Sequence, residues 1–137
     1  MQRTLAIIKP DGVQQHVVGR VLARIEEEGF RIVALRMARL DRAEAEGFYA
    51  VHRERPFFNE LTAFMSSGPA IVMVLEADNA IPRWREVMGA TDPSQAAEGT
   101  LRRQFASNIE RNVVHGSDAE ATAEFEIGYF FGGIDLI

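Results

Sequence analysis

The residues best suited to chemistry lie in the segment 111–118, which reads RNVVHGSD and contains the imidazole of His115. The β-branched residues before the histidine predict a brief strand at 112–114. Ser117 and Glu120 have the spacing of a capping box, which predicts that a helix begins at Ser117. Because the free N–H groups of a helix start attract phosphate, we expect a phosphate beside a reactive His115. An ordinary loop histidine is the alternative.

Position 9 holds the only lysine among the 15 basic residues of the chain. Every other cation is an arginine, so the exception indicates a task for a compact ammonium rather than a planar guanidinium. Lys9 follows the apolar run 5–8 and precedes the turn-forming sequence Pro-Asp-Gly. Ligands commonly collect at the carboxyl ends of strands, so we expect Lys9 to serve a site. A compositional bias towards arginine is the alternative.

Length and composition predict one globular domain over residues 1–137, because the chain can bury a sizeable core and 47% of it is hydrophobic. The net charge of −5 argues against nucleic acid as the main partner, so any site for a polyanion must be local. The absence of cysteine excludes disulfides and thiolate metal sites. The longest apolar run, 70–75, cannot span a bilayer, and no secretory segment is present. We therefore expect a cytoplasmic protein without a membrane partner.

Hydrophobic patterning predicts four strands, at residues 4–8, 30–40, 70–75 and 112–114. In the second strand, Val33, Leu35 and Met37 are expected to point towards the core. The stretch 89–111 is expected to be irregular. A loop of about twenty residues in a compact domain is usually functional or held by a partner.

Capping residues and amphipathic spacing predict five helices, at residues 18–28, 41–51, 56–68, 78–88 and 117–131. Asp41 with Glu44 forms an acidic capping box for the second helix, and Asp78 is expected to cap the fourth. The resulting order is β-α-β-α-α-β-α-β-α. Its simplest packing is an α+β, ferredoxin-like split βαβ sandwich, with a four-stranded antiparallel sheet and helices over it.

Arginines cluster at positions 53, 55, 83, 85, 102 and 103, and guanidinium groups suit phosphate oxygens. No glycine-rich loop with Lys-Ser or Lys-Thr is present, which excludes a Walker-type phosphate site. No cluster of aspartates and histidines could form a metal cage made by the protein alone.

Several motifs in order resemble the nucleoside diphosphate kinase family over essentially the whole chain. They are the segments 9–12 (KPDG), 55–58 (RPFF), 67–69 (SGP), 89–93 (GATDP), 99–102 (GTLR) and 112–118 (NVVHGSD). The resemblance implies transfer of the terminal phosphoryl group from a nucleoside triphosphate to a nucleoside diphosphate, by a ping-pong route through a phosphohistidine. It also implies Mg²⁺ carried mostly by the nucleotide, and a homo-oligomer that is either a tetramer or a hexamer.

The same resemblance assigns roles to individual residues. His115 is the nucleophile, Glu126 orients its imidazole, and Ser117 supports the same cluster. Asp118 contacts the metal through water, with a plain helix-start carboxylate as the alternative. The nucleotide site is lined by Lys9, Tyr49, Phe57, Arg85, Thr91, Arg102 and Asn112. Asp92 stands where the family usually has asparagine, which adds a negative charge next to Thr91.

These residue types fit the implied reaction. A phosphoramidate on imidazole keeps the phosphoryl group at a high transfer potential, whereas a phosphoserine would trap it. The side chain of Phe57 can stack on any base, which agrees with broad base tolerance, and a core position is the alternative for this residue. Lys9 and the arginines, with Mg²⁺, would stabilise the in-line transition state.

Two other classes of function remain open from the sequence. A noncatalytic nucleotide-sensing module would keep Phe57 and the arginines without needing a paired His115 and Glu126. A phosphohistidine hydrolase or mutase would require further catalytic histidines, and the chain offers only His16 and His52.

Overall fold

The structure is a computed structural model that describes residues 1–137. Its centre is a four-stranded antiparallel sheet with the strand order β2-β3-β1-β4. The strands are β1 (Gln2–Ile8), β2 (Arg31–Ala38), β3 (Ala70–Ala77) and β4 (Val114–Gly116). β3 lies between β1 and β2, and β1 lies between β3 and β4, which is the split βαβ arrangement. The predicted α+β, ferredoxin-like sandwich is confirmed.

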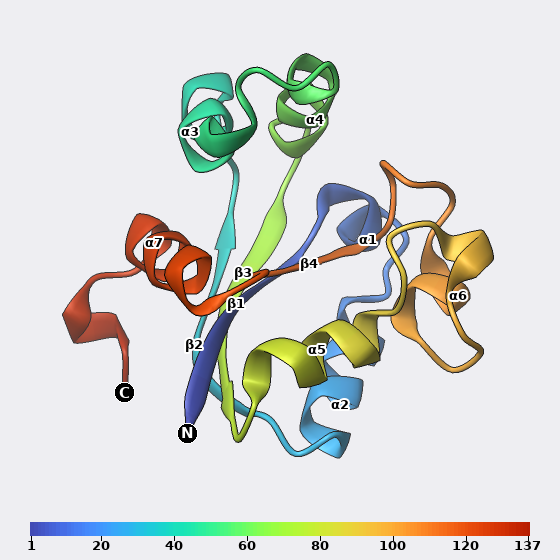
Figure 1. Cartoon of the computed structure of the whole chain (residues 1–137), viewed down its shortest axis with the longest axis vertical. Helices are drawn as coiled ribbons and strands as arrows, with labels where there is room; N and C mark the ends of the chain where they lie inside the picture. Colours follow the sequence, from blue (N-terminus) through green and yellow to red (C-terminus); the bar gives the residue numbers. More distant parts are fainter.

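Helices pack around both faces of this sheet. They are α1 (Pro10–Gln14), α2 (Val18–Glu27), α3 (Arg42–Phe48), α4 (Phe58–Met65), α5 (Ala80–Met88), α6 (Leu101–Phe105) and α7 (Glu120–Phe130). α2 and α5 lie on one side and α7 on the other, while α3 and α4 stand at the end away from both termini (Figure 1). Sequence patterning misses α1 and α6, because helices of 5 residues are too short to show an amphipathic period. None of the helices has the length and apolar character needed to cross a bilayer.

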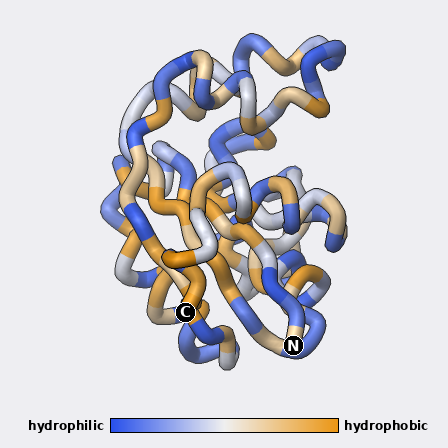
Figure 2. The backbone as a smooth tube through the Cα atoms, turned by 90° about the vertical axis from the view of Figure 1, so that its left-hand side faces the viewer, coloured by the Kyte–Doolittle hydropathy of each residue, from blue (hydrophilic) through white to orange (hydrophobic).

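The hydrophobic core forms two layers, one on each face of the sheet. Alternate residues of β1 serve both layers: Ala6 and Ile8 pack with α2 and α5, whereas Leu5 and Ile7 pack with α3, α4 and α7. The central strands are accordingly the most continuously hydrophobic part of the chain, and the outer loops are largely hydrophilic (Figure 2). Because side chains alternate along a strand, each position of β1 is committed to one layer.

Strand β2 is an edge strand whose register shifts between Ile32 and Ala34. Val33 is buried as predicted, but Leu35 and Met37 are 45% and 56% exposed, so the prediction that they point into the core is wrong. The bulge reverses the alternation, and beyond it Ala34 rather than Leu35 packs against the core.

The predicted capping box at the start of α3 is confirmed: the side chain of Asp41 accepts from the Glu44 N–H, and the Glu44 side chain accepts from the Asp41 N–H. The predicted cap of α5 by Asp78 is wrong. Asn79 is the N-cap residue, and the side-chain oxygen of Gln2 in β1 accepts from the Ile81 N–H at 2.8 Å. A distant side chain thus satisfies the free donor that a local cap was expected to satisfy.

The stretch 89–111 contains more regular structure than predicted. A 3₁₀ turn at Pro93–Gln95 and the helix α6 interrupt it. The Thr100 side chain accepts from the Arg103 N–H and caps α6. The fourth strand begins at Val114 rather than 112, because Val113 has a positive φ of 73° and leaves the extended conformation.

Candidate active site

A cleft of about 520 Å³ opens where the sheet meets α4, α5, the segment that follows α3 and the stretch 89–111. Every predicted site residue lines it except Ser117 and Glu126, which lie behind His115. The lining residues among the predicted set are Lys9, Tyr49, Phe57, Arg85, Thr91, Arg102, Asn112, His115 and Asp118. The fold therefore brings together residues from all parts of the chain.

Strand pairing decides on which face His115 lies. His115 pairs with Ile7 across β1 and β4, and Ile7 belongs to the core layer formed with α3, α4 and α7. Side chains opposite each other in an antiparallel pair share a face of the sheet. The imidazole accordingly packs edge-on against Phe48 and Tyr49, with ring centroids 5.5 and 6.3 Å away.

Helix α7 supplies the hydrogen-bond partner of the imidazole. Nε2 of His115 lies 2.9 Å from Oε1 of Glu126, and the hydroxyl of Ser117 donates to the same oxygen at 2.9 Å. An ionised carboxylate only accepts hydrogen bonds, so Nε2 is the nitrogen that carries the proton. Nδ1 makes no hydrogen bond within the chain and keeps its lone pair.

Ser117 does not begin a helix. Its buried hydroxyl also accepts from the Leu5 N–H, and α7 begins at Glu120 after the N-cap residue Ala119. The predicted capping box of Ser117 with Glu120 is wrong, and so is the expected helix start beside His115. The Ser117 hydroxyl bonds Leu5 of β1 and Glu126 instead of the backbone N–H groups of a helix start.

Helix α5 fixes the backbone around His115. The indole Nε1 of Trp84 donates to the His115 carbonyl at 3.1 Å. A Cβ on Gly116 would lie only 2.5 Å from Cδ1 of Trp84 and 2.8 Å from Cε of Met88. Position 116 therefore requires glycine because α5 packs directly on the strand.

Lys9 follows β1 directly and is almost fully buried. Its backbone N–H donates to the Val113 carbonyl at 2.7 Å, and its Nζ donates to Oδ1 of Asn112 at 2.8 Å. The Asn112 amide in turn donates to the Thr91 carbonyl at 3.3 Å. Burial, together with the charge of Arg102, lowers the pKa of Lys9 to about 8.

Arg102 ties two segments of the cleft wall together. Its guanidinium donates to the carbonyls of Gly89, Asn112 and Val114 at 3.0, 3.3 and 2.8 Å. Three of its five N–H groups are thus used, and one remains on each terminal nitrogen for a ligand. Burial and the charge of Arg85 lower the pKa of Arg102 to about 10, so it stays a cation at neutral pH.

The mouth of the cleft carries an exposed ion pair. Nη1 of Arg85 lies 2.7 Å from Oδ1 of Asp118. The alternative interpretation of Asp118 as a helix-start carboxylate is wrong, because α7 begins beyond it. No group of three or more histidine, aspartate or glutamate residues in the chain could hold a metal ion by itself.

The apolar end of the cleft holds Phe57, which is 46% exposed and so does not occupy a core position. The rings of Phe57 and His52 have centroids 5.6 Å apart. Leu61, one helical turn after Phe57, and Ile109 also line the cleft, and the sequence analysis predicted neither as a site residue. Ile109 had one sequence signal, since it is the only aliphatic residue between two polar stretches of an otherwise hydrophilic segment.

The hydroxyl of Tyr49 is buried and has no hydrogen-bond partner within the chain. Burial, with a smaller contribution from the charge of Glu126, raises the pKa of Tyr49, so the hydroxyl keeps its proton. Buried hydroxyls are normally hydrogen-bonded, and Tyr49 lines the cleft. Its hydroxyl is therefore available to a bound ligand.

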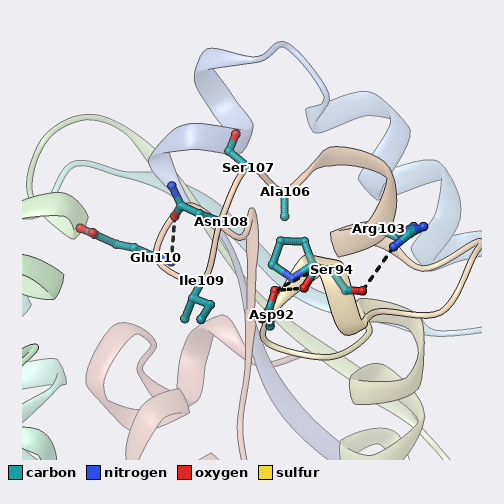
Figure 3. A pocket seen from close by; sticks show the side chains of 9 residues that line it. Asp92, Ser94, Arg103, Ala106, Ser107, Asn108, Ile109 and Glu110 are labelled. Carbon is teal, nitrogen blue, oxygen red and sulfur yellow. Dashed lines mark hydrogen bonds between the residues drawn. The ribbon is translucent and has the colours of Figure 1, made fainter.

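A second cavity of about 670 Å³ lies beside the cleft and is formed by residues 92–94, 103 and 106–110 (Figure 3). Its polar groups largely bond to one another: the Asp92 carboxylate accepts from the N–H and hydroxyl of Ser94, and Asn108 accepts from the Glu110 N–H. Apart from Ile109 and Glu110, it shares no residue with the cleft. Asp92 thus faces this cavity, and its charge is not part of the cleft wall.

The chain matches the family model of nucleoside diphosphate kinases over residues 2–136. A nucleoside diphosphate kinase of Desulfosudis oleivorans is 62% identical over 137 residues, covering 100% of this chain and 99% of the relative. One of Syntrophotalea carbinolica is 58% identical over 137 residues and covers 100% of both chains.

Solved structures agree. The nucleoside diphosphate kinase of Aquifex aeolicus has a TM-score of 0.98 and 45% identity, with 99% of each chain covered. That of Halobacterium salinarum, solved in complex with CDP, has a TM-score of 0.95 and 39% identity, with 99% of this chain and 91% of that chain covered. The chain belongs to the nucleoside diphosphate kinase family.

Lys9→Arg keeps the positive charge, but we expect it to lower turnover by on the order of a hundredfold or more. The buried ammonium has a single partner position, at Asn112, and a wider guanidinium cannot occupy it. Steady-state kinetics measure the effect, and Arg53→Lys on the exposed surface is the matched control, expected to be nearly silent. Turnover of Lys9→Arg near that of the wild type would show that the lone lysine is a compositional accident.

The lowered pKa of Lys9 also predicts how binding depends on pH. Lys9 is an ammonium below pH 8 and loses its proton as the pH rises through about 8. Binding of a phosphate ligand favours the ammonium, so the dissociation constant for ADP should rise above pH 8, by at most about tenfold per pH unit for one proton. Titration calorimetry between pH 7 and 9.5 checks this. In Lys9→Arg the rise should be absent, and an equal rise in both proteins would exclude Lys9 as its source.

Proposed function

We propose that this chain transfers the terminal phosphoryl group of a nucleoside triphosphate to a nucleoside diphosphate, with His115 carrying the group between the two nucleotides. One observation carries the proposal: His115 has Nε2 bonded to a buried carboxylate and Nδ1 unbonded, inside a cleft lined by cations. A carboxylate at Nε2 fixes the tautomer in which Nδ1 is the nucleophile. Membership of the family supports the same reaction.

In the first half-reaction, the lone pair of Nδ1 attacks the terminal phosphorus. The P–N bond forms while the P–O bond to the β-phosphate breaks, and the diphosphate leaves with that oxygen and its bonding electrons. The imidazole becomes positively charged, and Glu126 stabilises that charge through the proton kept on Nε2. The second nucleoside diphosphate then attacks the phosphohistidine by the reverse of these steps.

The cations of the cleft suit the charge of the transferred group. Lys9 projects its ammonium at the end of β1, Arg102 keeps two free N–H groups, and Arg85 lies at the mouth. Stabilising a phosphoryl transition state is mainly a matter of positioned charge. The Asn112 amide donates to the Thr91 carbonyl and so fixes the part of the cleft beside these cations. The Tyr49 hydroxyl has no partner within the chain and can bond a ligand.

The donor set fits Mg²⁺ only as a metal carried by the nucleotide. Three carboxylates line the cleft, those of Glu60, Glu110 and Asp118, but they form no metal cage, and Asp118 is exposed and paired with Arg85. Asp118 would hold the ion through water, and the ion would neutralise charge on the phosphate oxygens when bound. Only Nη1 of Arg85 bonds Asp118, so the other N–H groups of its guanidinium stay available to a phosphate while Asp118 faces the ion.

The base is expected at the apolar end of the cleft. Phe57 offers an exposed ring, and Ile109 and Leu61 also line the cleft, so a base can be held by stacking and apolar contact. Neither kind of contact reads the base edge, which supports broad base tolerance. The CDP complex of the Halobacterium salinarum relative supports a nucleoside diphosphate as one ligand of this cleft.

The alternative classes fit the site less well. A nucleotide-sensing module has no use for a histidine whose Nε2 is held by a buried Glu126 with Ser117 behind it. A hydrolase or mutase would need a second histidine near the first. His52 lines the cleft, but it packs against Tyr49 and Phe57 rather than against His115, and His16 lies outside the cleft.

Assembly and location belong to the same proposal. A homo-oligomer is supported by Leu35 and Met37, which are exposed apolar side chains on the edge strand β2. The unpaired backbone groups of an edge strand are a ready template for pairing with another chain. The tetramer or hexamer and the cytoplasmic location stay predictions.

His115→Ala should abolish phosphoenzyme formation and leave the fold and nucleotide binding largely intact, because the imidazole lines the cleft and Glu126 keeps its hydrogen bond from Ser117. After incubation with γ-labelled ATP, the wild type should carry an acid-labile, alkali-stable label that any nucleoside diphosphate removes. His52→Ala and His16→Ala are the matched controls and should still be labelled. Label on His115→Ala would exclude the proposed nucleophile.

A further inference from the structure

Val113 has a conformation that its side chain disfavours. Its φ is 73°, it is fully buried, and a β-branched residue in this region is a genuine outlier. The Val114 N–H donates to the Asn112 carbonyl at 2.8 Å across it, which defines a γ-turn centred on Val113. This γ-turn with positive φ is rare and strained, and strain of this kind persists only where the surroundings hold it.

The junction between β1 and α1 holds both sides of Val113. Oδ2 of Asp11 accepts from the Val113 N–H at 3.1 Å, and the Lys9 N–H donates to the Val113 carbonyl at 2.7 Å. A Cβ on Gly12 would lie 3.1 Å from Cγ1 of Val113 and 2.8 Å from Cγ2 of Ile8. Glycine at position 12 thus leaves the room that the turned valine needs.

The γ-turn decides where the residues on either side of it point. Before the turn, Oδ1 of Asn112 accepts from Nζ of Lys9 at 2.8 Å and its carbonyl accepts from Arg102. After the turn, β4 pairs with β1 and sets His115 on the face that meets α7. A relaxed Val113 would rotate the Asn112 peptide away from Lys9 and displace the start of β4.

We propose that Asp11 is a positioning residue for phosphoryl transfer: its carboxylate holds Val113 in the γ-turn, which places Asn112 and His115 on the same cleft as Lys9. The inference rests on the proposed function of the cleft. Asp11 does not line the cleft, so it acts through the backbone and not on the substrate.

The environment of Asp11 agrees with this role. The side chain is only 4% exposed, and Oδ1 has no hydrogen-bond partner. Burial raises the pKa of Asp11, while the charge of Lys9 and the hydrogen bond from Val113 act in the opposite direction. Burying a carboxylate is unfavourable for the fold, and among the backbone N–H groups that stabilise this one, that of Val113 belongs to the strained residue.

The test compares Asp11→Ala with Asp11→Asn, which keeps an acceptor oxygen for the Val113 N–H. The readout is the single-turnover rate of His115 phosphorylation at saturating ATP. The fluorescence of Trp84 reports this rate, because Trp84 is the only tryptophan and its indole donates to the His115 carbonyl. Asp11→Ala should slow transfer by on the order of tenfold to a hundredfold, because small misplacements are costly. Asp11→Asn should remain within a few-fold of the wild type, and the ADP dissociation constant should change less than the rate in both.

Rescue by glycine separates positioning from a general loss of structure. Glycine adopts positive φ without strain, so Val113→Gly removes the need for the clamp. The double variant Asp11→Ala/Val113→Gly should transfer faster than Asp11→Ala alone. Val21→Ala, a core truncation in α2, is the control for lost stability and should keep the wild-type rate. Melting curves identify the temperature at which all variants are folded.

A wild-type rate in Asp11→Ala, or a double variant no faster than Asp11→Ala, would overturn the inference. If Asp11→Ala does not fold, Asp11→Leu, which is close to aspartate in size and has no acceptor oxygen, takes its place in both comparisons. Failure of the wild type to label on His115 would instead overturn the proposed function, so the two failures are distinguishable.

Discussion

The hydrogen bond between Nε2 of His115 and Glu126 is the interaction on which the site depends. It selects the tautomer of the imidazole, and it can form only if α7 crosses the face of the sheet on which β4 places the histidine. That face is set by the pairing of His115 with Ile7. The register of two strands and the path of one helix therefore determine which nitrogen is free to react. Ser117 completes the arrangement by joining the same carboxylate oxygen to the Leu5 N–H of the central strand.

The polar groups of the site are buried at a cost in stability that their mutual hydrogen bonds partly offset. Burial removes water from Lys9, which lowers its pKa. The hydrogen bond to Asn112 and the charges of nearby carboxylates partly offset this cost. Arg102 is held by three backbone carbonyls rather than by an acid. Because no carboxylate forms an ion pair with Lys9 or Arg102, a phosphate ligand would meet positive charge that is already positioned. Preorganised charge of this kind lowers the barrier without reorganisation during the reaction.

Much of the fold and part of the site could be predicted from the sequence. The four strands, the five longer helices and the capping box of Asp41 with Glu44 depend on local spacing, and the structure contains all of them. The contact of Glu126 with His115 could not be derived locally, because it depends on how α7 crosses the sheet. One signal was present: Glu126 lies on the same stripe of α7 as the buried Ala123 and Phe130. The turn at Val113 gave no signal, since β-branched residues favour the extended conformation that it abandons.

The most direct test of the central claim is to identify the nitrogen that carries the phosphoryl group. Nε2 is engaged with Glu126 and Nδ1 is unbonded, so the attacking atom is fixed by the fold rather than by the intrinsic chemistry of imidazole. Enzyme labelled with ¹⁵N-histidine can be phosphorylated with ATP and examined by ³¹P–¹⁵N correlated NMR under alkaline conditions. We expect phosphorus bonded to Nδ1 of His115. Phosphorus on Nε2 would contradict the assignment, because Glu126 would then have to release the imidazole before the reaction.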